Sequence, residues 1–291
     1  MALIRLILIA ALVLSMLRAT GEPVAAGKTI PGIPVIPPSA FSDSIVIQET
    51  PAPDSTSVQA QAVDLFRAVL LRDYSRMEDL LAGGIGADAE LPAGPPDDFL
   101  RILPDARLVY YAQHEQGFTV LMFAAALGDR EAVNVLLRHG ADRWKKTKRH
   151  RTFALWLGAK TGNVGLIRDL MGLEPGGEWS RYEVRVSLSG QTMTLFENGI
   201  PLWDSPVSSG KKSHPTPTGQ FVVTDKYRDW KSSLYEAKMP FFVRLSCSDF
   251  GFHAGRLPGY PASHGCIRMP KDKARALFET IPRGALVVIS E

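Results

Sequence analysis

Hydrophobic positions between residues 58 and 173 recur with the spacing of short amphipathic helices. The segment 121–137 realigns on 155–171 at an offset of 34 residues, so that Val133 in the first copy corresponds to Ile167 in the second. Helical units of this length stack on one another, because a single unit cannot bury its own apolar face. The pattern therefore predicts a stack of helix pairs over residues 58–175.

The clearest copy of this repeat, residues 119–142, resembles an ankyrin repeat, and the second copy resembles it less closely. A third helix pair with a degenerate pattern is expected at 63–84, where it would cap the stack. The segment 89–111 between these copies is longer than an ankyrin hairpin. The resemblance implies a surface that docks a protein partner, and the alternative is a helical support for the rest of the chain.

After residue 180 the hydrophobic pattern changes to a period of two. Val184 and Val186 alternate with Arg185 and Ser187. Further strands are expected at 192–196, 219–224, 241–245, 249–253 and 285–290, with one helix at 270–280. Successive strands with little helix predict a mainly β, sandwich or barrel-like domain over 180–291, and hence a multidomain α and β chain.

The first 21 residues have the pattern of an export signal. Arg5 precedes an apolar run at 6–17, and small residues follow. That run is short for a bilayer, which needs about 20 residues, so a cleaved signal peptide is favoured over an anchor in the inner membrane. Residues 22–57 are rich in proline and predict an extended linker. We therefore expect an exported, periplasmic protein.

Composition adds little to this organisation. The 291 residues are 45% hydrophobic and 22% charged, as in ordinary globular domains. A formal net charge of +3 gives no reason to expect a nucleic-acid partner.

Residues suited to nucleophilic chemistry are concentrated near the end of the chain. His253 ends an expected strand, and Cys266 follows it in a loop bracketed by glycines. A free thiol has a pKa of about 8.5 and is mostly protonated at neutral pH, so a nucleophilic cysteine needs a base to take its proton. The pair predicts thiol chemistry in a cleft at the surface of the domain.

The segments around this pair resemble the active-site signature of the L,D-transpeptidases, the YkuD-type enzymes that cross-link peptidoglycan. The resemblance rests on His-Ala-Gly at 253–255 and Ser-His-Gly-Cys-Ile-Arg at 263–268, and it extends upstream through 207–210 and 216–221. It implies a thioester on Cys266, a tetrapeptide stem as donor, an amine as acceptor, and no cofactor or metal. Water in place of the amine would make the same scaffold a hydrolase.

The resemblance also implies roles for the residues beside the nucleophile. His253 would accept and donate the proton, oriented by the backbone carbonyl of Ala254. Backbone N–H groups at His264, Gly265 and Cys266 would stabilise the oxyanion.

Two residues of the signature are expected to bind substrate. Arg268 stands where some members of the family carry asparagine, and it would hold a carboxylate of the stem peptide. Ser263 is the second residue that we expect to bind substrate. The loop at 254–262 is shorter than is usual in the family, which leaves the identity of the acceptor open.

Competing interpretations involve the same few residues. Cys247 and Cys266 are the two cysteines, and an even count in an exported protein suggests a disulfide. A disulfide would consume the nucleophile, so we expect Cys266 to be free and Cys247 to be a small residue near a strand end. A zinc site built from both cysteines, His253 and His264 lacks the usual paired spacing of ligands. Asp249 is a rival to orient the base, although a turn residue is the simpler interpretation.

The repeats suggest a last alternative, an interaction protein whose ankyrin-like part carries the function. The intact Cys266 and His253 favour an enzyme instead.

Overall fold

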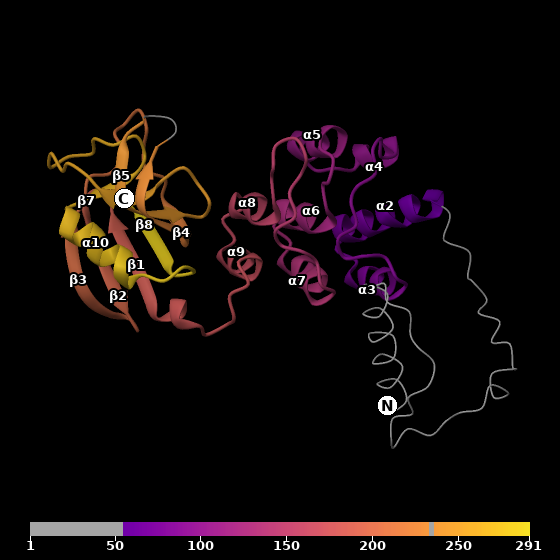
Figure 1. Cartoon of the computed structure of the whole chain (residues 1–291), viewed down its shortest axis with the longest axis horizontal. Coiled ribbons are helices and arrows are strands. Elements are labelled where there is room, and N and C mark those ends of the chain that lie inside the picture. Colours follow the sequence, from indigo (N-terminus) through magenta and orange to yellow (C-terminus); the bar gives the residue numbers. More distant parts are fainter. Residues whose placement is uncertain (1–54, 233–235) are drawn as a thin grey trace, which may run out of the picture. The chain divides into compact units, whose positions relative to one another are not determined.

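A helical region precedes a β-sheet domain along the chain (Figure 1). The computed structural model describes residues 55–232 and 236–291. The expected export signal at 1–21 and nearly all of the expected linker at 22–57 lie outside these residues. In the part of the chain that is described, no helix is both long enough and apolar enough to cross a membrane.

The helical region is built from helix pairs, as the 34-residue offset predicted. The expected insertion at 89–111 contains one short helix and the start of another. The helices are α2 (Ser55–Leu71), α3 (Tyr74–Ala82), α4 (Asp97–Arg101), α5 (Ala106–His114), α6 (Val120–Leu127), α7 (Arg130–Arg138), α8 (Ala154–Ala159) and α9 (Val164–Leu170).

The two copies of the repeat use the same chemistry at the turn between their helices. Gly128 and Gly162 both have a φ of +72°, a conformation that glycine adopts without strain. The next residue, Asp129 or Asn163, caps the following helix by accepting a hydrogen bond from the backbone N–H three residues later, at 3.0 and 3.1 Å. Local sequence therefore specifies each turn.

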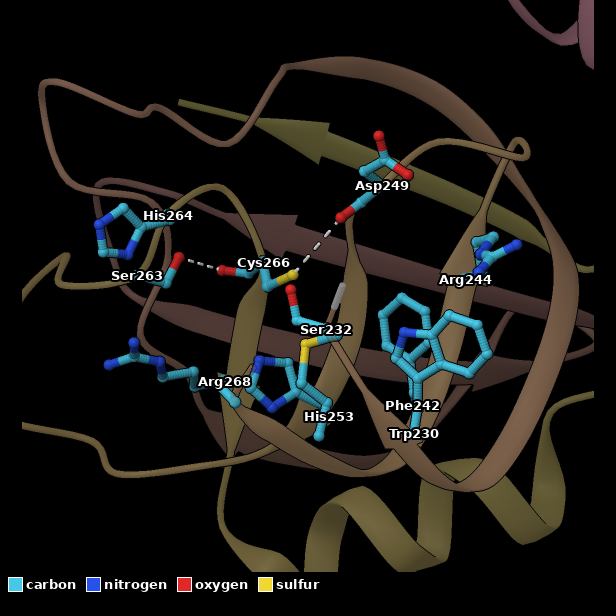
Figure 2. Close-up of a pocket in the computed structure, with 12 residues that line it drawn as sticks. Trp230, Ser232, Phe242, Arg244, Asp249, His253, Ser263, His264, Cys266 and Arg268 are labelled. Atoms are coloured by element: carbon cyan, nitrogen blue, oxygen red, sulfur yellow. Dashed lines mark hydrogen bonds between the residues drawn. The ribbon is translucent and has the colours of Figure 1, made fainter. Parts of the chain in front are cut away.

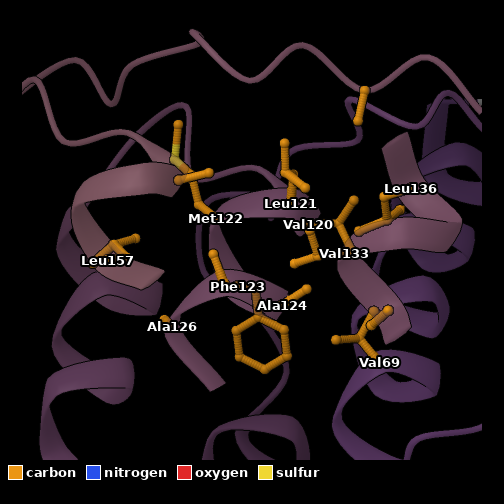
Figure 3. Close-up of a cluster of buried hydrophobic side chains, with 14 of the residues drawn as sticks. Val69, Val120, Leu121, Met122, Phe123, Ala124, Ala126, Val133, Leu136 and Leu157 are labelled. Atoms are coloured by element: carbon orange, nitrogen blue, oxygen red, sulfur yellow. The ribbon is translucent and has the colours of Figure 1, made fainter. Parts of the chain in front are cut away.

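Helix α6 is the centre of the helical core, because α2, α7 and α8 pack around it. Each residue from Val120 to Ala126 is buried, and Figure 3 shows the apolar side chains gathered around it. The Phe123 ring lies 5.2 Å from that of Phe66 and 6.1 Å from that of Phe99. Phe99 belongs to α4, so the insertion contributes to the core instead of forming a long hairpin.

The β domain contains, among the described residues, one mixed eight-stranded sheet in the order β3-β2-β1-β8-β4-β5-β6-β7. A short 3-10 helix at Glu178–Arg181 leads into it. The strands are β1 (Tyr182–Ser187), β2 (Thr192–Glu197), β3 (Ile200–Pro206), β4 (Gly219–Lys231), β5 (Lys238–Leu245), β6 (Gly251–Ala254), β7 (Ile267–Met269) and β8 (Leu286–Ser290), and helix α10 spans Lys271–Thr280.

The period of two is confirmed where one face of a strand is buried. Val184 and Val186 on β1 are buried, as are Met193 and Leu195 on β2. Strands β3 and β7 were not predicted from the sequence. The first is an edge strand with mostly exposed side chains, so it has no alternation to detect, and the second has three residues and lies inside the signature at 263–268.

The sheet curves so that β7, the last strand in this order, meets the segment that follows β3, the first strand. The long strand β4 pairs first with β8 and then with β5, with an irregularity in register between Val223 and Asp225. Beyond β3, Ser208 bridges to Arg268 and residue 210 bridges to residue 263. These contacts hold the loop that ends at Cys266 against the body of the domain.

Candidate active site

One cleft of the β domain contains most of the residues that the signature singled out. Strand β6, strand β7 and the loop before β7 form one side, and the hairpin of β4 and β5 forms the other. Figure 2 shows Ser263, His264 and Arg268 on one side of Cys266, with an aromatic wall and Arg244 on the other. The lining residues are Trp230, Ser232, Ala237, Met239, Phe242, Arg244, Asp249, His253, Ser263, His264, Cys266 and Arg268.

His253 is fixed by the parallel pairing of β6 with β7, in which it lies opposite Arg268. Its ring is buried, with 7% of the residue exposed. The Nδ1 atom lies 2.9 Å from the carbonyl oxygen of Ala254, the contact that the resemblance implied. A ring that donates from Nδ1–H presents an unprotonated Nε2, which is the form of a general base.

The electrostatics around His253 keep this base neutral. Burial lowers the pKa of the imidazole, and the positive charge of Arg268 lowers it further. The hydrogen bond to the Ala254 carbonyl opposes both effects. Because the balance lies below the ordinary value of about 6.5, His253 can accept a proton at neutral pH.

Cys266 is a half-buried residue whose thiol is neutral at rest. Burial raises its pKa and the negative charge of Asp249 adds to this, while a hydrogen bond from the Gly251 backbone and the charge of Arg268 lower it. The sulfur atom lies 3.9 Å from the backbone carbonyl oxygen of Asp249. The cleft therefore holds a neutral thiol and a neutral imidazole, an arrangement in which a thiolate would form by proton transfer to the histidine.

A network of hydrogen bonds within the loop holds Cys266 in place. The Ser263 hydroxyl donates to the carbonyl of Cys266 and accepts a hydrogen bond from the N–H of Gly265 at 3.1 Å. Gly265 has a φ of +109°, which favours glycine. The Gly265 N–H is therefore engaged inside the loop, whereas the resemblance assigned it to an oxyanion.

The upstream motifs at 207–210 and 216–221 support this loop from behind. The hydroxyl of Thr216 donates to the carbonyl of Gly265 at 2.8 Å and accepts from the N–H of Gly210, also at 2.8 Å. A Cβ atom on Gly210 would lie 2.2 Å from the carbonyl oxygen of His214, so the position requires glycine. The sequence marks both motifs, and the structure adds that the Thr216 hydroxyl joins them to the loop that ends at Cys266.

His264 and Arg268 lie on the side of Cys266 that faces away from the aromatic wall (Figure 2). The rings of His264 and His214 meet edge to face at a centroid distance of 4.8 Å. Partial desolvation by its neighbours and the charges of Lys211, His214 and Arg268 lower the pKa of the exposed His264. The methylene groups of Arg268 pack against Gly255. A Cβ atom added to Gly255 would lie 3.0 Å from the Cγ atom of Arg268.

The opposite wall of the cleft was missed by sequence analysis. Trp230 and Phe242 stack with a centroid distance of 6.1 Å and an interplanar angle of 17°. Arg244 lies beside them on β5. No motif marks these residues, because it is the register of the β4–β5 hairpin that brings them to the cleft.

Cys247 and Asp249 occupy the turn between β5 and β6, as expected for a small residue near a strand end and for a turn residue. Both cysteines are free. Burial is the main cause that raises the pKa of the Cys247 thiol to about 11. Within the described residues, no three histidine, cysteine, aspartate or glutamate side chains gather into a group that could hold a metal ion.

Comparison with known families identifies both parts of the chain. Residues 181–289 match the L,D-transpeptidase catalytic domain of the YkuD type, and residues 116–148 match the ankyrin repeat. The protein therefore carries an L,D-transpeptidase catalytic domain preceded by an ankyrin repeat.

Individual relatives share this domain at moderate identity. YkuD of Bacillus subtilis, named as an L,D-transpeptidase, is 30% identical over 112 residues, which are 38% of this chain and 66% of the relative. L,D-transpeptidase 1 of Mycobacterium tuberculosis is 31% identical over 115 residues, which are 34% of this chain and 46% of the relative. A crystal structure of that mycobacterial protein aligns with 38% of this chain and 62% of its own at 28% identity and a TM-score of 0.34. The chain thus spans less than two thirds of the length of these relatives.

Proposed function

We propose that this protein is a peptidoglycan L,D-transpeptidase that works through a thioester on Cys266. The observation that carries the proposal is the convergence of Cys266 and His253 in one cleft of a matched catalytic domain. The contact between His253 Nδ1 and the Ala254 carbonyl supports it, since this contact leaves Nε2 as the base.

In the first half of the proposed reaction, Nε2 of His253 takes the proton of the Cys266 thiol as the sulfur attacks a peptide carbonyl of a tetrapeptide stem. The carbon–sulfur bond forms and the carbonyl oxygen becomes an oxyanion. The intermediate collapses when the carbon–nitrogen bond breaks, and the imidazolium returns its proton to the departing amine of the terminal D-amino acid. A thioester remains on Cys266.

The second half transfers the acyl group to an acceptor amine. The amine attacks the thioester carbon and gives its proton to His253, and the carbon–sulfur bond then breaks. The proton returns to the sulfur, which restores the thiol, and the new amide is the cross-link. Water in place of the amine would release the tripeptide and make the protein a hydrolase.

We assign stabilisation of the oxyanion to the backbone N–H of Cys266, together with the backbone of the loop at His264. Gly265 already donates its N–H to Ser263, so we give Gly265 a structural role in the turn. A donor held by the rigid loop needs little rearrangement as charge develops on the oxygen, which is the basis of stabilisation by preorganised dipoles.

The remaining parts of the chain fit this function as follows. Peptidoglycan lies outside the cytoplasmic membrane, so we propose that residues 1–21 direct export or anchor the chain and that residues 22–57 are the linker. The helical region at 58–175 would dock a protein partner through its ankyrin-like surface. Cys247 would contribute to packing alone.

Full-length protein incubated with a disaccharide-tetrapeptide, with and without a second muropeptide, tests the reaction. Intact-protein mass spectrometry should detect a covalent disaccharide-tripeptide adduct that is absent from Cys266→Ala. A cross-linked dimer supports transpeptidation, whereas free tripeptide with no dimer assigns the protein to the hydrolases. Absence of any adduct and any product would contradict the proposal.

A further inference from the structure

Arg244 is a charged residue in the cleft that the mechanism above does not use. It lies on β5 opposite Asp225 of β4, on the far side of Cys266 from Arg268 (Figure 2). Its side chain is largely enclosed, with 22% exposed. The position calls for an explanation, because an enclosed guanidinium needs partners for its N–H groups.

Aromatic rings surround the guanidinium of Arg244 without satisfying those groups. Its central carbon lies 5.0 Å from the centroid of the Trp230 ring, 5.4 Å from that of Tyr227 and 5.8 Å from that of Phe242. Such stacking engages the faces of the planar cation and holds its orientation. Hydrogen bonds leave in the plane of the group, so the rings leave its donors available.

The polar partners of Arg244 are incomplete. Asp225 approaches Nη1 at 3.9 Å, beyond the range of a direct hydrogen bond. The Nε atom is buried and has no hydrogen-bond partner. A carboxylate placed in the cleft could accept from the guanidinium edge through two oxygens, which is the geometry that arginine binds best.

We propose that Arg244, held by Trp230 and Phe242, is a binding site for a carboxylate of the stem peptide. This inference rests on the proposed function, since stem peptides supply the carboxylate. A transpeptidase must hold two stems, and this cleft carries one arginine on each side of Cys266. Arg244 binds one stem on the aromatic side, and Arg268 is left to the other.

Arg228 on the same hairpin provides a matched comparison. Its guanidinium lies 5.9 and 5.7 Å from the ring centroids of Phe241 and Phe278, yet Arg228 does not line the cleft. Both arginines therefore stack on aromatic rings, and Arg244 alone of the two faces the site. Loss of Arg228 reports the cost of losing a stacked arginine from this hairpin.

The first test measures binding without chemistry. In full-length Cys266→Ala protein, calorimetry compares the disaccharide-tetrapeptide with derivatives in which one carboxylate at a time is an amide. We expect one amide to weaken binding by about 10- to 100-fold, the range for hydrogen bonds to a charged group. Adding Arg244→Gln should reduce that discrimination to less than about threefold, whereas adding Arg228→Gln should leave it intact.

The second test identifies which stem Arg244 binds. The same amides are placed on the donor or on the acceptor, and the rates of thioester formation and thioester consumption are measured separately. If Arg244→Gln abolishes the effect of an amide on thioester formation, Arg244 binds the donor. If it abolishes the effect of an amide on thioester consumption, Arg244 binds the acceptor. Arg244→Lys keeps the charge without the planar fork and should restore only part of the discrimination.

The proposal is overturned if every amide effect survives Arg244→Gln in protein whose melting temperature matches that of Arg228→Gln. It is also overturned if Cys266→Ala protein binds the free acids and all amides equally. Failure of the wild type to form a thioester would contradict the transpeptidase function, and the binding comparison would still decide the role of Arg244.

Discussion

The two cysteines of this protein lie in two turns of one domain, and their surroundings differ in what they do for a thiol. Burial raises the pKa of both. Cys266 faces a cleft with a neutral histidine and receives a hydrogen bond from the Gly251 backbone. Cys247 does not line that cleft, and the N–H of its backbone donates to the hydroxyl of Thr224.

The contrast between the two sites indicates that the proposed reactivity of Cys266 does not require a stable thiolate. A lowered resting pKa is one way to activate a cysteine, and an adjacent base is the other. The raised pKa of Cys266 and the lowered pKa of His253 favour the second way. Access to the cleft and an adjacent base distinguish Cys266 from Cys247, because burial raises the pKa of both thiols.

Removal of each sulfur gives the largest expected contrast. Cys266→Ala should lower the rate of thioester formation by at least about 10⁴-fold, because no other group replaces the nucleophile. Cys247→Ala should change it by less than about twofold. Mass spectrometry of the adduct with a tetrapeptide donor measures the rate of thioester formation in both variants. Comparable losses of rate would contradict the expected difference between the two cysteines.

Removal of the base should have the next largest effect. His253→Gln should slow thioester formation by about 10²- to 10⁴-fold, the usual contribution of a positioned base. His264→Gln is the matched control, because its ring lies on the outer side of the nucleophile against His214. We expect the control variant to slow thioester formation by less than about tenfold. An equal loss of rate in both variants would contradict the role of His253 as the base.

Loss of the charge of Arg268 should alter how the Cys266 thiol responds to pH, with Cys247 as the internal reference. Arg268 lowers the pKa of Cys266, so Arg268→Gln raises it and leaves less thiolate at any pH below that pKa. Alkylation of Cys266 by iodoacetamide should then slow severalfold near neutral pH and recover at pH values above the pKa. Peptide mapping reports Cys247 in the same sample, and its alkylation should rise only as the pH approaches about 11.

The same variant should shift the acid limit of activity. Arg268 also lowers the pKa of His253, so its removal raises that pKa and the base becomes protonated at a higher pH. The acid limb of the pH profile for thioester formation should move upward. A limb that moves downward would contradict this account of the electrostatics.

Two buried threonines offer the smallest and most selective test. Thr216 supports the Cys266 loop and Thr224 supports Cys247, each through its hydroxyl. Replacement of either by valine should cost about 1–3 kcal/mol of unfolding free energy, because a buried polar group loses its partner. Chemical denaturation measures this cost.

Activity distinguishes the two threonine variants. Thr216→Val should also slow thioester formation severalfold, since the turn at Gly265 loosens, whereas Thr224→Val should leave the rate unchanged in folded protein. Equal rates in both variants would show that the loop does not depend on Thr216.

Sequence predicted the parts of the fold that local patterns encode. The helix pairs and the alternating strands β1 and β2 follow from residues close together in the chain. The insertion at 89–111 could not be placed from sequence, because the burial of Phe99 depends on its contact with Phe66 and Phe123.

The candidate site divides in the same way. The side that carries Cys266 and His253 lies in a compact signature, so sequence marked it. The wall of Trp230, Phe242 and Arg244 depends on the register of the β4–β5 hairpin and left no local signal. Engagement of the Gly265 N–H by Ser263 is likewise a fact of backbone geometry that no residue pattern displays.

The most direct test of the central claim is a time course of intact-protein mass spectrometry on wild type, Cys266→Ala and Cys247→Ala with a tetrapeptide donor. The account predicts an adduct of tripeptide mass on wild type and Cys247→Ala, none on Cys266→Ala, and conversion of the adduct into a cross-linked dimer when an acceptor muropeptide is added. An adduct that persists in Cys266→Ala, or one that is lost in Cys247→Ala, would contradict it.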